Sequence, residues 1–100
     1  MRYVARRLEV LPAALQEAVA ATRWYLEHDE RVAAAYEAEL TRVFDEIERA
    51  PETWPRHHHG THRFLLRRFP YEVVYKIYTE LVLIIAVAHC KRKPGYWRQR

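Results

Sequence analysis

The sequence is short of cysteine, of glycine and of long apolar runs. Cys90 is the single cysteine, so no intrachain disulfide can form and a reducing compartment fits. The longest apolar run, Leu81 to Ala88, has the length of a strand and falls far short of the roughly 20 residues of a membrane helix. No apolar leader stretch precedes Arg6 and Arg7. We therefore expect a cytoplasmic protein without a membrane partner.

Internal repeats, linkers and low-complexity segments are also lacking. One hundred residues leave room for a single core, so we expect one domain over residues 1–100. Half of the residues are hydrophobic and 13% are aromatic, which suffices for a small core and is too much for a disordered chain.

Positive charge is concentrated in the second half of the chain. Residues 1–55 hold seven arginines and no lysine against eleven carboxylates, a net charge of −4. Residues 56–100 hold seven arginines and three lysines against Glu72 and Glu80, a net charge of +8. Such a field attracts a polyanion or an acidic protein segment.

The first half predicts an exposed or edge strand followed by two helices. The strand is expected at Tyr3 to Leu11, and Pro12 suits the first turn of a helix. This helix is expected over residues 13–27, with its core face at Leu15, Ala18–Val19 and Tyr25–Leu26. Asp29 is a good N-cap for the next helix.

The second helix is expected from Glu30 to about Ala50, where Pro51 ends it. One apolar stripe should face the core, formed by Val32, Tyr36, Leu40, Val43–Phe44 and Ile47. The acidic and basic residues between these positions, Glu39 among them, should stay in water. The short break before this helix predicts an antiparallel pair.

The second half predicts three strands after a loop over residues 51–60. We expect them at residues 62–68, 71–78 and 81–89, with a turn at Thr79-Glu80. The last strand is apolar on both faces and should be central. The order of elements predicts an α+β fold: an N-terminal strand, an antiparallel helical pair, then a three-stranded antiparallel meander in one antiparallel sheet with the helices on one face.

The end of the last strand carries residue types that grip and cleave RNA. Cleavage by 2′-hydroxyl attack needs a base, an acid and cations for the phosphorane charge. The candidate catalytic residues are His89, Arg92 and Tyr96. The alternative is structural, with His89 bonded to a backbone carbonyl and Tyr96 packed on the sheet.

The same region can bind a protein partner instead. Arginines at 63, 67 and 68 can hold phosphates or carboxylates bidentately. The candidate partner-binding residues are Arg63, Arg67, Arg68, Lys76, Lys91, Lys93 and Trp97. The histidines at 57, 58, 59 and 62 come from one segment with no cysteine nearby, so we expect no metal site, and we expect no cofactor.

The block from Arg63 to Tyr75, RFLLRRFPYEVVY, resembles the RelE/ParE toxin superfamily, nearer its ParE-type branch. Ala86-Val87-Ala88-His89 and the following Pro94-Gly95-Tyr96-Trp97 strengthen the match. The resemblance implies a small toxin of a type II toxin–antitoxin pair, often called a plasmid stabilisation protein. It also implies an antitoxin that neutralises the toxin by wrapping an extended or helical tail over it.

The resemblance leaves the cellular target open. RelE-type members cut mRNA on the ribosome, whereas ParE-type members poison DNA gyrase. Tyr96 falls where the RelE-type tyrosine stands, but Glu72 and Cys90 stand where functional basic residues are expected. A carboxylate among phosphate ligands repels substrate, which favours the gyrase branch. The alternatives are an mRNA endonuclease and a degenerate member that only binds its antitoxin, and the free toxin could form a homodimer.

Overall fold

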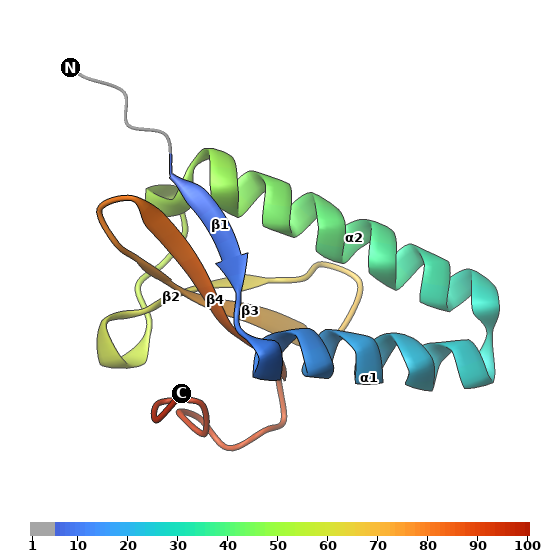
Figure 1. Ribbon diagram of the computed structural model, residues 1–100. Helices are drawn as coiled ribbons and strands as arrows, with labels where there is room; N and C mark the ends of the chain where they lie inside the picture. The colour runs from blue at the N-terminus through green and yellow to red at the C-terminus, as the bar shows by residue number, and fades with distance from the viewer. Residues whose placement is uncertain (1–5) are drawn as a thin grey trace.

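The computed structural model describes residues 6–100 and has two helices packed on one four-stranded sheet (Figure 1). The strands are β1 (Arg7–Val10), β2 (His62–Leu65), β3 (Tyr71–Ile77) and β4 (Leu81–His89). The helices are α1 (Pro12–His28) and α2 (Glu30–Arg49), followed by two short 3-10 turns, Pro51–Thr53 and His58–Gly60. The predicted α+β fold class is confirmed. Residues 3–5 of the predicted first strand lie outside the described residues.

The sheet has the order β1-β4-β3-β2 and is mixed, which corrects the expectation of an antiparallel sheet. β2, β3 and β4 form the predicted antiparallel meander, whereas β1 runs parallel to β4. β1 lies at an edge and β4 lies inside, as predicted. The apolar character of β4 on both faces accounts for its inner position, but it does not determine the direction of β1.

Three strands are shorter than the sequence predicts. β1 spans Arg7–Val10, so Arg6 and Leu11 of the predicted first strand lie outside it. β2 ends at Leu65 instead of Arg68, because the Arg67 amide leaves the sheet and donates to the Glu39 carboxylate of α2 (2.6 Å). Glu39 is therefore 8% exposed, which corrects the expectation that this side chain stays in water. β3 ends at Ile77, and the amide of Tyr78 closes the predicted turn on the carbonyl of Leu81 (2.7 Å).

The helix α1 buries a face that overlaps the predicted one only in part: Ala18 is buried and Tyr25 packs against the core, as predicted. Its buried residues are Ala14, Ala18 and Ala21, because these short side chains let the helix backbone lie close to β4 and α2. Leu15 and Leu26, both expected in the core, are each 55% exposed, and Val19 is 48% exposed. These three larger side chains thus lie outside the core.

The helix α2 follows its prediction more closely. Tyr36, Leu40, Val43 and Ile47 are buried against α1 and the sheet, and Asp29 caps the helix by accepting the amide hydrogen bond of Arg31 (2.9 Å). The helix ends at Arg49, one residue before Ala50, as expected from Pro51. Val32, expected in the stripe, is 37% exposed and lies in the first turn of α2.

The sheet has a second, smaller core on the face away from the helices. Here Val74, Ile85 and Ala86 pack against Trp97 of the C-terminal segment. A bulge between Val74 and Tyr75 shifts the register with β4. β4 is apolar on both faces, so it supplies Ile84 and Val87 to the first core and Ile85 and Ala86 to the second. The C-terminal segment therefore lies under the sheet, and this arrangement builds the pocket described next.

Candidate functional site

A pocket of about 180 Å³ lies where the C-terminal segment meets the end of β4. All three candidate catalytic residues, His89, Arg92 and Tyr96, line it. Arg63, Lys93 and Trp97 of the candidate partner-binding set line it as well. These candidates, selected from the sequence, therefore lie around one pocket in the folded chain.

The Tyr96 hydroxyl is held by a carboxylate of α1. It donates a hydrogen bond to Glu17, and both Glu17 oxygens also accept from Arg100 (2.9 and 3.0 Å). The amide of Val87 in β4 donates to the same carboxylate (3.0 Å). The sequence reading did not single out Glu17, because its partners lie 70 to 83 residues away along the chain.

This network controls the ionisation of both groups. Burial raises the pKa of Glu17, but the hydrogen bonds from Arg100, Tyr96 and Val87 outweigh it and lower the pKa below its ordinary value. Burial, together with the hydrogen bond to Glu17, raises the pKa of Tyr96. Tyr96 therefore stays protonated at neutral pH and its proton is already donated, which is a poor state for a general base.

His89 and Arg92 are also engaged in local contacts. Nδ1 of His89 accepts the amide hydrogen bond of Lys91 (3.1 Å), and its ring meets the Tyr71 ring edge to face at 5.1 Å. The Arg92 guanidinium stacks on the Tyr96 ring, 3.8 Å from its centroid. These contacts fix the C-terminal turn. They differ from the structural alternative predicted for His89, because its ring accepts from a backbone amide and, within residues 6–100, does not bond to a carbonyl.

A carboxylate occupies the same pocket among the cations. Glu72 is 14% exposed at its side chain, and its Oε2 lies 3.6 Å from His57 Nε2 and 3.8 Å from Arg63 Nη1. Both distances exceed a hydrogen bond, and Oε2 has no hydrogen-bond partner among residues 6–100. Burial raises the pKa of the Cys90 thiol, and the nearby carboxylate of Glu72 raises it further. The pocket thus holds a negative charge and a neutral thiol where a phosphate site calls for cations.

Burial lowers the pKa of His57, reinforced by Arg63 and the neighbouring histidines and opposed by Glu72. His57 is therefore mainly neutral at pH 7. Within residues 6–100, no group of three or more His, Cys, Asp or Glu side chains is arranged to hold a metal ion.

Four candidate partner-binding residues do not line this pocket: Arg67, Arg68, Lys76 and Lys91. Arg67 and Arg68 follow β2 and line a hollow against α2, and Lys76 of β3 lies near the Tyr78 ring at 5.6 Å. Lys91 and Lys93 are exposed on the C-terminal turn. Trp97 is 3% exposed and packs on the sheet, so a partner would meet the outer surface of this segment rather than the indole.

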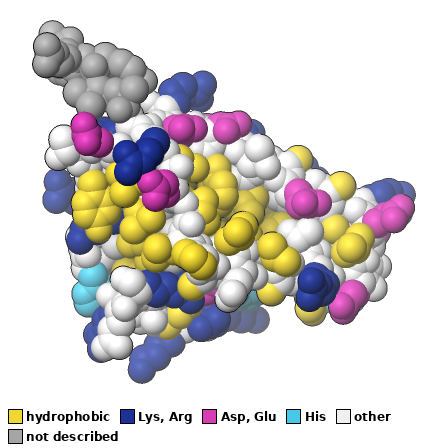
Figure 2. Space-filling model, viewed as in Figure 1, with side chains coloured by type: hydrophobic (Ala, Val, Ile, Leu, Met, Phe, Trp, Pro, Cys, Tyr) yellow, Lys and Arg dark blue, Asp and Glu magenta, His cyan; other side chains and the backbone are white. Residues whose placement is uncertain are grey.

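A third surface was missed by the sequence reading. A groove of about 420 Å³ runs between α1 and α2 and is lined by Leu15, Val19, Leu26, Leu40 and Phe44, among others. Figure 2 shows hydrophobic side chains gathered along this interval between the helices. Its signal in the sequence was the spacing of Ala14, Ala18 and Ala21, which offers a second buried face for α1 and frees the larger side chains.

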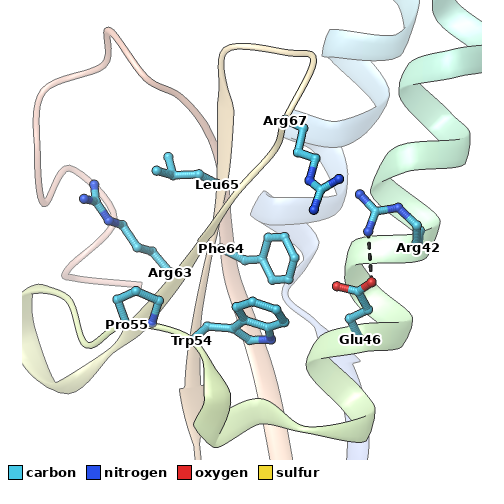
Figure 3. Close-up of a pocket in the computed structure, with 8 residues that line it drawn as sticks. All are labelled: Arg42, Glu46, Trp54, Pro55, Arg63, Phe64, Leu65 and Arg67. Carbon is cyan, nitrogen blue, oxygen red and sulfur yellow. Dashed lines mark hydrogen bonds and ion pairs between the residues drawn. The ribbon is translucent and has the colours of Figure 1, made fainter.

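A fourth surface lies between α2 and the edge strand β2. It is a groove of about 430 Å³ whose lining includes Trp54, Phe64 and three arginines, at 42, 63 and 67 (Figure 3). The rings of Trp54 and Phe64 meet at its base in a tilted pair, with centroids 4.2 Å apart and an interplanar angle of 55°.

Within residues 6–100, no helix is long and apolar enough to span a bilayer.

A family model described as the ParE toxin of the type II toxin–antitoxin system parDE matches residues 8–94. The chain therefore belongs to the ParE toxin family, as its sequence predicted.

Solved structures share this fold, two of which are toxin–antitoxin systems by their descriptions. One is described as the chromosomal ParDE system from P. aeruginosa, with 12% identity, a TM-score of 0.76, and coverage of 85% of this chain and 96% of that chain. The other is described as the toxin–antitoxin complex RelBE2 from Mycobacterium tuberculosis, with 22% identity, a TM-score of 0.52, and coverage of 86% and 99%. A search of curated proteins found no match.

Proposed function

We propose that this ParE-family toxin arrests growth in the cytoplasm by binding a protein target, DNA gyrase, and is neutralised by a cognate antitoxin that covers the α1–α2 groove. The observation that carries the neutralisation step is the exposed apolar surface of α1. Leu15 and Leu26 are each 55% exposed and border one continuous groove. Removing that surface from water favours a partner with an apolar face.

The groove suits an amphipathic helix. Leu15, Val19 and Leu26 lie on one face of α1, and Phe44 of α2 closes the opposite wall. A partner helix with apolar residues at i, i+4 and i+7 would lie along these side chains. Arg23 and Glu37 also line the groove and can pair with charges on the flanks of that helix.

The engagement of Tyr96 supports the binding mode over the nuclease alternative. A nuclease needs a free acid and base beside the phosphate, and the Tyr96 hydroxyl is committed to Glu17. The carboxylate of Glu72 in the pocket also argues against a nuclease, because it repels phosphate. The one observation in favour of an mRNA endonuclease is that His89, Arg92 and Tyr96 share a pocket.

Toxicity and rescue test the neutralisation step together. The chain is expressed alone and with the product of the neighbouring reading frame, as wild type, Leu15→Lys, Val19→Lys and the control Gln16→Lys. Gln16 is exposed on α1 but does not line the groove. We expect all four chains to arrest growth, and the two groove variants to escape rescue because the antitoxin binds them at least about tenfold more weakly.

Full rescue of both groove variants would place the antitoxin elsewhere. A groove variant that changes from dimer to monomer in solution would show that a second copy covers the groove instead. Normal growth with soluble, folded wild-type chain would leave only the degenerate member that binds its antitoxin.

The target is tested with purified gyrase and with cellular mRNA. We expect supercoiling to fall as toxin is added, while primer extension shows no new mRNA ends within codons. Unchanged supercoiling at high toxin excess would exclude gyrase, and new ends within codons would establish the nuclease.

A further inference from the structure

We propose that the outer edge of β2 and the groove beside it bind an extended, acidic segment of a partner protein by strand addition. This site is separate from the α1–α2 groove and does not depend on the identity of the toxin's target. It rests on three features: a free strand edge, an apolar base with an unpaired donor, and the Arg67 guanidinium, which forms no ion pair with residues 6–100.

The free edge follows from the hydrogen-bond register of β2. The Arg63 amide points outward and donates to the carbonyl of Pro55 (3.0 Å), whereas the Leu66 amide points inward to the carbonyl of Tyr71 (3.0 Å). Backbone groups alternate along an antiparallel strand, so the amide and carbonyl of Leu65 point outward. Within residues 6–100 neither of them has a hydrogen-bond partner outside the strand.

The first part of the β2 edge is covered and the second part is not. Arg56 forms a bridge with His62, so the preceding loop occupies the start of the strand. The uncovered part begins after Arg63 and coincides with the 430 Å³ groove. Leu65 itself is 50% exposed. An exposed edge of this kind is a template for an added strand.

The base of the groove offers an apolar contact and a hydrogen-bond donor. Phe64 and Trp54 project from the β2 side toward α2, as Figure 3 shows. The indole Nε1 of Trp54 is buried and has no acceptor among residues 6–100. A buried unpaired donor costs about 1–3 kcal/mol, so an acceptor supplied by a ligand would bind favourably here.

The charges of the groove select an acidic segment. Figure 3 shows the Arg67 side chain reaching from the end of β2 toward Arg42 on α2. Arg42 is paired with Glu46 (2.9 Å), whereas the Arg67 guanidinium forms no ion pair with residues 6–100. The buried Glu39 fixes the Arg67 amide and so holds this guanidinium at the mouth of the groove.

The groove continues into a second hollow of about 630 Å³ along α2. Arg42, Glu46 and Arg67 border both cavities, and Arg68 is added in the second. Alternate residues of an added strand lie about 7 Å apart on one face. Two carboxylates spaced in this way could meet Arg67 and Arg68 while the residue between them faces outward. The paired backbone groups favour a polypeptide over a nucleic acid.

The test uses a fluorescent peptide with alternating valine and glutamate, the matched valine–lysine peptide, and a uridine decamer RNA. Anisotropy is measured with the purified full chain. We expect the acidic peptide to bind at least about tenfold more tightly than the basic one. Leu65→Pro removes the outward amide without touching the β2–β3 hydrogen bonds, and should weaken binding about tenfold. Arg67→Glu should weaken it at least as much.

Two controls match these variants. Leu65→Ala keeps the amide and should retain binding within about twofold, because β-augmentation depends on the backbone. Arg98→Glu makes the same charge reversal at an exposed C-terminal residue outside the groove and should behave like the wild type apart from a small general charge effect. If Leu65→Pro fails to fold, methylating alternate amides of the peptide tests the same hydrogen bonds.

Three results would overturn the proposal. One is equal binding of the acidic and basic peptides. Another is tight binding of a peptide methylated on either set of alternate amides, which excludes strand addition. The last is displacement of the acidic peptide by RNA, with RNA binding weakened by Arg67→Glu but not by Leu65→Pro. This result would define the groove as a surface for polyanions in general. None of these results depends on whether the chain is toxic or the antitoxin occupies the helical groove.

Discussion

The Tyr96 hydroxyl donates a hydrogen bond to the carboxylate of Glu17, which joins the C-terminal segment to the first helix across 79 residues of sequence. Arg100 binds both oxygens of the same carboxylate, and its Nη1 also donates to the carbonyl of Ile85 (3.1 Å). A single side chain of α1 therefore anchors the segment that forms one wall of the basic pocket. This contact makes Tyr96 a structural residue of the pocket.

Replacing Glu17 should loosen the C-terminal segment without unfolding the domain. Glu17→Gln removes the charge that Arg100 and Tyr96 share, and we expect the free energy of unfolding to fall by about 2 kcal/mol. Urea denaturation measures this loss, and amide hydrogen exchange should rise at residues 96–100. Glu27→Gln, an exposed change on the same helix, is the matched control. Equal effects of the two variants would show that the anchor contributes nothing.

The same anchor should weaken in acid. The pKa of Glu17 is lower in the folded chain than its ordinary 4.5, so its contribution to stability is complete above about pH 4.5 and is lost as pH falls through the folded value. The difference in unfolding free energy between wild type and Glu17→Gln should therefore shrink below pH 4.5. His57 and His62, whose pKa values are lowered by burial, cause a separate loss of stability below about pH 6.5. This loss is the same in wild type and variant, so it cancels in the difference between them. A difference that does not change with pH would contradict the lowered pKa.

Tyr96→Phe separates structure from catalysis. The variant loses only the hydrogen bond to Glu17, so we expect a stability loss of about 1 kcal/mol and unchanged growth arrest at a temperature where the chain stays folded. Growth curves and primer extension on cellular mRNA measure the outcome. His89→Ala is the companion variant and should also remain toxic. Loss of toxicity in Tyr96→Phe with a fully folded chain would restore the nuclease hypothesis.

Two buried tyrosines should respond in opposite ways to loss of the hydroxyl. Tyr75 donates to the carbonyl of Pro51 (2.5 Å), so Tyr75→Phe should lower stability by about 1 kcal/mol and leave that carbonyl unpaired. The Tyr36 hydroxyl is buried with no partner among residues 6–100. Tyr36→Phe should therefore leave stability unchanged or raise it by up to about 1 kcal/mol. Thermal unfolding of both variants measures these changes in stability. Equal losses of stability would show that the Tyr36 hydroxyl has a hydrogen-bond partner in solution.

The sequence by itself determined the elements, the family and the electropositive C-terminal half. Pro12, Asp29 and Pro51 mark helix ends through local backbone chemistry, and the apolar character of Leu81 to Ala88 requires a central strand. These signals depend on only a few neighbouring residues, so they can be recognised in the sequence without knowledge of the fold. The set of His89, Arg92 and Tyr96 was also found from sequence, because one strand end and one turn carry all three.

Only the tertiary structure decided how these residues are used. The face that α1 buries depends on how closely its alanines approach β4, and this choice leaves Leu15, Val19 and Leu26 as a surface. The parallel position of β1, the burial of Glu39 and the anchoring of Tyr96 by Glu17 all join residues far apart in the chain. Periodicity and composition carry no information about such pairs, because their energies arise only when the chain has folded.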